Sequence, residues 1–298
     1  MRRFYAGLAG RVFVLFILVV AIVPASQAAR LHAPAYWTVS QGEATVYLFG
    51  SIHLMTRQTP WFTPQLQRLF AAADDATFEM TPEQSSAAVL GPLVREMGLY
   101  QPGDSLKNHM PPAAYAALGK VLAGLGLAPS AYDRMKPWLA SVTLATQVAA
   151  AHGFSPDYGI DKTLGDQAVA TGKPVFGLET ARQQLSLFSS LSPAVQRDLF
   201  EETLDELQDV QSLFGKMRDA WLGADLAGLE VVLNQTMTPG LAEALLYARN
   251  RAWLPHIVAL LQKPGVHFVT VGAGHLVGDK SLLALLRAKG FTVVRGAR

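Results

Sequence analysis

Two histidines in matching local sequences are the residues of this chain best suited to chemistry. His53 and His275 each end a G-x-x-H unit, opened by Gly50 and by Gly272 and preceded by a strand-like run. An imidazole serves both as a metal ligand and as an acid or base near neutral pH. Gly50, Gly272 and the additional Gly274 permit backbone angles that turn an imidazole back over the end of a strand. We expect His53 and His275 to share one metal ion.

Glu79 is the expected third ligand. It follows Phe78 near the end of the strand-like run at 75–80, where an unpaired carboxylate would be costly. Consecutive strands usually lie side by side, which would bring Glu79 to the same sheet edge as His53. Two imidazoles and one carboxylate match the three-ligand-plus-water pattern of catalytic zinc and of open non-haem metal sites. The alternative is a glutamate that caps a helix or forms a salt bridge.

Three further charged residues are weaker candidates for catalysis. Asp161 begins a predicted helix, where it serves as a cap, a base or a ligand. Glu179 ends a short strand and either supports the site or caps the next helix. Arg249 lies within a predicted helix, where it is solvated or supplies positive charge to an oxyanion or a substrate carboxylate. Trp138 is expected in the core. The remaining histidines lack such spacing and are expected to be structural: His32, His109, His152, His256 and His267.

The elements that must position these residues predict an α/β fold. Strand-like runs occupy 35–40, 45–50, 75–80, 174–178, 266–271 and 292–295, and the first two read as a hairpin. Helical patterns cover 64–73, 82–99, 111–127, 137–152, 159–171, 180–191, 193–214, 216–222, 226–234, 239–261 and 280–289. We expect a central mixed sheet built from both chain ends, with a long and mostly helical middle. Ligand sites in open α/β sheets collect at the carboxyl ends of the strands.

Composition excludes several classes of protein. The 298 residues are half apolar and 16% charged, which is ample for a core. The absence of cysteine excludes disulfides, thiolate nucleophiles and iron–sulfur clusters, so a metal such as zinc, manganese, cobalt or iron must be held by His, Asp and Glu. Without Arg2, Arg3 and Arg11, 22 basic side chains face 23 acidic ones, and no basic face for nucleic acid is expected.

The N-terminus has the pattern of a secretory signal peptide over residues 1–28. Arg2 and Arg3 form a basic start, followed by the apolar run 12–23 and the small-residue stretch 24–28. The run is shorter than the roughly 20 residues of a spanning helix, although a retained anchor is the alternative. We therefore expect a bacterial periplasmic or secreted protein that contacts the membrane only through this peptide before cleavage. Residues 29–298 are expected to form one α/β domain with a helical insertion at about 82–262.

A series of motifs resembles the TraB/GumN family, relatives of the Tiki proteins. In chain order they are LFGSIHLM at 48–55, FEM at 78–80, MKPW at 135–138, YGID at 158–161, GKPVFGLET at 172–180, RNRAW at 249–253, VGAGHLVG at 271–278 and LLRAKGFTVVR at 285–295. By this resemblance His53, Glu79 and His275 occupy signature positions. It implies a metal-dependent hydrolase, since Tiki members are described as metalloproteases. It also implies a distant similarity to erythromycin esterases and to haem-binding ChaN-like proteins, with a comparable His/Glu cluster at the sheet edge.

The resulting hypothesis is a hydrolase in which a metal-bound water attacks an amide or ester of an unknown peptide or small molecule. Asp161 or Glu179 would carry the proton, and Arg249 would stabilise developing negative charge. No H-E-x-x-H motif is present, so cleavage of a peptide bond is implied by the family likeness alone. Two competing hypotheses are a periplasmic haem- or metal-binding protein without turnover and a scaffold without a functional site.

Overall fold

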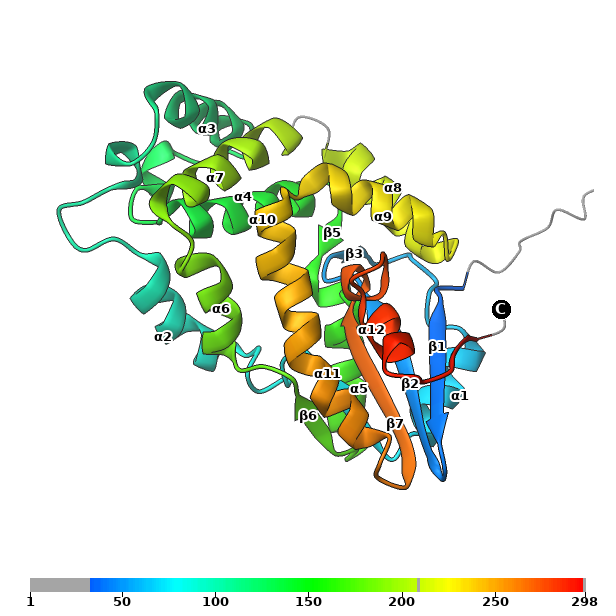
Figure 1. Cartoon of the computed structure of the whole chain (residues 1–298). Coiled ribbons are helices and arrows are strands. Elements are labelled where there is room, and N and C mark those ends of the chain that lie inside the picture. Colours follow the sequence, from blue (N-terminus) through cyan, green and yellow to red (C-terminus); the bar gives the residue numbers. More distant parts are fainter. Residues whose placement is uncertain (1–32, 208–209, 297–298) are drawn as a thin grey trace, which may run out of the picture. The chain divides into compact units, whose positions relative to one another are not determined.

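A mixed six-stranded sheet is the frame of the protein in the computed structural model, which describes residues 33–207 and 210–296 (Figure 1). Its strand order is β6-β4-β7-β2-β1-β8. The strands are β1 (Tyr36–Gln41), β2 (Ala44–Ser51), β4 (Asp75–Phe78), β6 (Val175–Gly177), β7 (Gly265–Gly272) and β8 (Val293–Arg295). The expected α/β fold, with a sheet assembled from both ends of the chain, is confirmed.

The predicted hairpin is present as β1 and β2, which pair antiparallel with Trp37 opposite Leu48. Gly42 lies in the turn with a φ of 56°, a conformation that glycine adopts without steric cost. Alternate residues of β1 are buried, while the last part of β2 is buried on both faces because a hydrophobic core covers each face of the sheet there. The hairpin thereby delivers the end of β2 into the centre of the sheet.

The strands β2, β7, β4 and β6 run parallel and end at one edge. Ser51 is paired with Gly272 across β2 and β7, and Phe78 is paired with Thr270 and with Gly177 across β4, β7 and β6. The expectation that the strands at 45–50 and 75–80 are direct neighbours is wrong, because β7 lies between them. The inserted strand is long and largely buried, as a central strand of a parallel sheet should be.

Helices cover both faces of this sheet. On one face α1 (Pro64–Ala72), α5 (Ile160–Ala170), α8 (Val210–Leu222) and α9 (Leu226–Thr236) contribute to a core that includes Phe268. On the opposite face, α11 (Ala248–Leu260) and α12 (Leu282–Ala288) pack over Val269 and Val271. Figure 1 shows α11 and α12 in front of the sheet and α5 behind it.

The middle of the chain is mostly helical, as expected, and has a hydrophobic core of its own. That core joins α3 (Pro112–Gly124), α4 (Pro137–Ala151) and α7 (Pro193–Glu206). Two further helices of the middle, α2 (Ala87–Gly98) and α6 (Ala181–Ser189), pack on each other. A small antiparallel sheet of β3 (Met55–Thr56) and β5 (Phe154–Ser155), which the sequence pattern did not predict, ties the loop after β2 to the end of α4.

Several predicted helix boundaries are wrong. The helix expected from 82 begins at Ala87, because the Ser86 hydroxyl accepts the Val89 N–H as an N-cap. The break expected near 215 is absent, since α8 runs through it. The helix expected over 239–261 is divided into α10 (Pro239–Ala242), a π-helical turn at Glu243–Tyr247 and α11.

Among the described residues, no helix has the length and apolar character needed to cross a membrane. The predicted signal peptide and His32 lie outside the described residues.

Candidate functional site

Side chains from distant parts of the sequence meet beside Gly272, at the end of β7. A Cβ atom placed on Gly272 would lie 3.2 Å from Glu79 Oε1, 3.5 Å from His275 Cδ2 and 3.9 Å from His53 Nε2. Each of these residues follows one of the parallel strands, so the common edge of the sheet brings them together. A Cβ at position 272 would be crowded by Glu79 Oε1, so the glycine leaves room for this close approach.

Arg249 is the positive centre of this cluster. Its Nε donates to Glu179 Oε1 at 2.8 Å, and its Nη2 donates to Glu79 Oε2 at 2.5 Å and to Glu179 Oε2 at 3.0 Å. The guanidinium lies 4.5 Å from the centre of the Trp253 ring. All three charged side chains are buried, with exposed fractions of 10% for Arg249, 6% for Glu79 and 10% for Glu179. The cation therefore compensates two carboxylates that water cannot reach freely.

Glu79 is held ionised by its surroundings. The Gly272 N–H donates to its Oε1 at 2.7 Å, and the Gln184 side-chain amide donates to its Oε2 at 3.0 Å. Burial alone would raise the pKa of Glu79, but the nearby positive charges and the Gly272 N–H lower that pKa below its ordinary value. The carboxylate is thus a fixed negative charge in the floor of the site.

His275 places a neutral imidazole beside Gly272 and Glu79. Asn250 donates from its side-chain nitrogen to the Lys280 carbonyl at 2.9 Å, which leaves its oxygen to accept from His275 Nδ1 at 2.6 Å. The lone pair consequently lies on Nε2, which accepts from Arg249 Nη1 at 3.2 Å and lies 3.5 Å from Glu79 Oε1. Burial lowers the pKa of His275 to about 3, so the ring stays uncharged.

His53 is at the mouth of the cluster, with 64% of its side chain exposed. Its Nδ1 donates to Asp161 Oδ2 at 2.7 Å, and the Ser51 hydroxyl donates to Asp161 Oδ1 at 2.7 Å. The negative charge of Asp161 raises the pKa of His53 to about 9. His53 is therefore an imidazolium at neutral pH in this arrangement.

The loop after β2 and the start of α5 fit together closely enough to position Asp161. A Cβ on Gly159 would lie 2.4 Å from the His53 carbonyl oxygen, so a larger residue there would push the two segments apart. The Ile160 N–H donates to the Ile52 carbonyl at 3.1 Å. Gly159 is the N-cap of α5, so of the three roles considered for Asp161 the helix cap does not hold.

The roles of the remaining candidate residues follow from their contacts. Thr180, not Glu179, caps α6. Arg249 is not a solvated helix residue, and Trp138 is buried as expected. His109 pairs with Asp104, His152 with the Val148 carbonyl and His267 with Asp75, all apart from the cluster at Gly272.

Four residues of the site carry no sequence signal of the kind that marks the histidines: Asn250, Gln184, Ser51 and Trp253. Gln184 binds Glu79, Ser51 binds Asp161, and Trp253 lies under the guanidinium of Arg249. Asn250 could have been noticed, because it stands between two arginines in the RNRAW motif.

The donor groups suit a divalent metal in their chemistry. Each histidine makes a hydrogen bond through Nδ1, to a carboxylate at Asp161 or to an amide oxygen at Asn250, as metal-bound histidines usually do. Arg249 now uses the lone pairs of Glu79 and His275 that such an ion would need. In residues 33–207 and 210–296 as they stand, no group of three or more His, Asp and Glu side chains is arranged to hold an ion.

Comparison with known proteins places these features in a family. The model of the TraB/PrgY/gumN family matches residues 35–295. The protein named "Uncharacterized protein YbaP" from Escherichia coli (strain K12) is 26% identical over 254 residues, which cover 85% of this chain and 92% of that protein. The protein of the same name from Shigella flexneri is similar to the same extent. No solved structure matches the chain significantly.

Proposed function

This chain belongs to the TraB/PrgY/gumN family, and from that premise we propose that it is a metal-dependent hydrolase of amide or ester bonds. The observation that carries the proposal is the meeting of two imidazoles and a buried carboxylate beside Gly272. A divalent ion such as zinc, manganese or cobalt is the cofactor that this donor set favours. Residues 1–28 support export to the periplasm or the medium.

His53, Glu79 and His275 would hold the ion. When bound, a divalent ion would supply a Lewis acid and would lower the pKa of a bound water towards about 7. Because ligand nitrogens must be deprotonated, His53 gives up its Nε2 proton on binding, while its Nδ1 stays hydrogen-bonded to Asp161. Asn250 keeps the lone pair of His275 on Nε2. Both imidazoles are thus oriented before an ion arrives.

Asp161 is better placed than Glu179 to carry a proton during hydrolysis. Both oxygens of Glu179 accept from Arg249, and the side chain is buried. Asp161 is more exposed, at 26%, and its partners are the Ser51 hydroxyl and His53 at the mouth of the site. Glu179 instead holds Arg249 in place, where the guanidinium would stabilise negative charge developing on a carbonyl oxygen.

Elemental analysis of the purified protein tests the metal site. We expect about one divalent ion per chain after loading and dialysis, and loss of that ion in the double variant His53→Ala/His275→Ala. The matched control is His109→Ala/His152→Ala, which removes two histidines outside the cluster. Equal metal content in both double variants would contradict the proposal.

Turnover separates a hydrolase from a binding protein. We expect the metal-loaded protein to cleave a peptide or ester library, and Asp161→Asn to lower the rate. A haem-binding protein would instead shift the Soret band of added haem, and that shift would depend on His53 and His275. A Soret shift of this kind without cleavage of any library member would favour binding over hydrolysis.

A further inference from the structure

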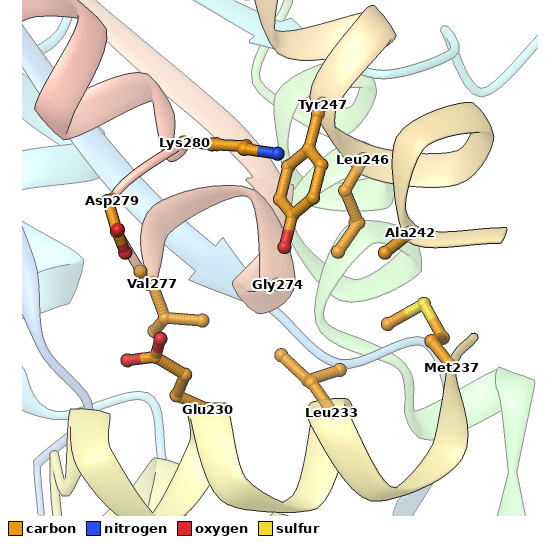
Figure 2. Close-up of a pocket in the computed structure, with 11 residues that line it drawn as sticks. Glu230, Leu233, Met237, Ala242, Leu246, Tyr247, Gly274, Val277, Asp279 and Lys280 are labelled. Atoms are coloured by element: carbon orange, nitrogen blue, oxygen red, sulfur yellow. The ribbon is translucent and has the colours of Figure 1, made fainter. Parts of the chain in front are cut away.

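A pocket of about 210 Å³ lies next to the cluster at Gly272 and has no role in the chemistry described so far. Figure 2 shows its walls, which come from α9, from the turn between α10 and α11, and from the loop after β7. Leu233, Met237, Leu246 and Val277 provide apolar surface. A Cβ on Gly274 would lie 3.3 Å from both Leu233 Cδ1 and Leu246 Cδ2, so the glycine allows the walls to approach the loop closely.

The π-helical turn at Glu243–Tyr247 connects this pocket to the candidate site. Such turns are rare in proteins overall. Those that do occur often lie at functional sites, where the extra residue redirects side chains. Here the turn supplies Leu246 and Tyr247 to the pocket, and in Figure 2 the Tyr247 hydroxyl points into it. The Leu245 carbonyl in the same turn accepts from Arg249 Nη1 at 2.9 Å. The turn that lines the pocket therefore also contacts Arg249, and Gly274 of the pocket directly precedes His275.

Acidic groups at the pocket lack cationic partners. Glu230 and Asp279 line it, and neither forms an ion pair with any residue of the described ranges 33–207 and 210–296. Lys280 also lines the pocket, where its Nζ lies 4.7 Å from the centre of the Tyr247 ring, so one cation faces the two carboxylates. The pocket thus combines apolar surface with an excess of one negative charge.

We propose that this pocket binds a ligand that has an apolar group next to an ammonium group. The proposal rests on the proposed hydrolase function, for which it specifies the substrate as a peptide with an apolar residue adjacent to a positive charge. A cavity of about 150 Å³ is large enough for benzene, so this pocket accommodates a side chain the size of leucine or phenylalanine. The ammonium, from the N-terminus or from a neighbouring lysine, is attracted to Glu230 and Asp279.

Ligand binding to the full chain without added metal tests this pocket independently of turnover. The probes are leucinamide, with a free α-ammonium, N-acetyl-leucyl-lysinamide, with a side-chain ammonium, neutral N-acetyl-leucinamide and anionic N-acetyl-leucine. The methyl signal of Met237, in protein labelled with ¹³C-methyl methionine, reports occupancy of the pocket. Saturation-transfer NMR of the ligands gives their affinities for each variant.

We expect at least one ammonium probe to shift the Met237 signal and to bind about fivefold more tightly than the neutral probe, with the anion weakest. The preferred ammonium probe identifies the source of the charge. Glu230→Gln should remove the preference, whereas Glu201→Gln, on exposed surface of α7, should not. Met237→Trp should abolish binding, whereas Val231→Trp, exposed on α9, should not.

A neutral probe that binds as tightly as both ammonium probes would overturn the proposal, and so would an unmoved Met237 signal with every probe. Neither result depends on metal or on catalysis. Binding of an ammonium probe without hydrolysis of any substrate would leave the pocket assigned and would contradict only the proposed function.

Discussion

Replacing Arg249 with methionine should destabilise the protein severely. The substitution keeps an apolar stem over Trp253 but removes the cation that Glu79 and Glu179 share. Removing one partner of a buried ion pair costs about 3–5 kcal/mol, because the remaining charge is left uncompensated. That is a large fraction of the roughly 5–15 kcal/mol that holds a typical domain folded.

Arg251 is a matched control in the same helix. It pairs with Glu243, but the two side chains are 54% and 46% exposed, so Arg251→Met should cost less than about 1 kcal/mol. Urea unfolding followed by tryptophan fluorescence measures both losses. In the Arg249→Met background, Glu179→Gln should recover part of the stability, since it removes a charge that has lost its partner. Equal small losses for Arg249→Met and Arg251→Met would refute the argument that Arg249 compensates buried carboxylates.

Three other perturbations have defined outcomes. Asp161→Asn should lower the pKa of His53 from about 9 towards its ordinary value, which an NMR titration of the ring protons would detect and an unchanged pKa would contradict. Gly272→Ala places a methyl group 3.2 Å from Glu79 Oε1 and should weaken metal binding about tenfold or more in a metal titration. The control Gly215→Ala, whose Cβ would lie in open space, should leave metal binding unchanged. Burial and the charge of Glu202 raise the pKa of Glu206 to about 7, so the protein loses stability as the pH rises from about 4.5 through 7. Glu206→Gln should therefore raise the Tm at pH 8 but not at pH 4. An equal change in Tm at both pH values would contradict this.

The strands that end beside the candidate site could be predicted from the sequence, because each has a recognisable local pattern of apolar residues and glycines. Alternation in β1 and β2 and the glycine between them predict the hairpin, and the apolar run of β7 predicts a buried strand. Parallel strands end at a common edge, so histidines placed just after β2 and β7 come together. Strand direction places His53 and His275 at the same edge, and the direct pairing of β2 with β7 brings them together.

Other features depend on tertiary packing that no local pattern reports. The insertion of β7 between β2 and β4 is a choice among possible strand orders. The Asn250 contact with His275 joins a helix to a loop, and the RNRAW motif does not show which residue Asn250 contacts. The π-helical turn at Glu243–Tyr247 interrupts a helical pattern that continues unbroken in the sequence. Such contacts are fixed only once the helices lie against the sheet.

Anomalous diffraction from a crystal of the chain loaded with Mn²⁺ or Zn²⁺ tests the proposed metal site most directly. We expect a single strong peak bound by the imidazoles of His53 and His275 and the carboxylate of Glu79, with Arg249 displaced from at least one of those ligands. A peak held by other residues, or a fully loaded crystal in which Arg249 keeps all its present hydrogen bonds and neither histidine binds the ion, would contradict the proposed centre.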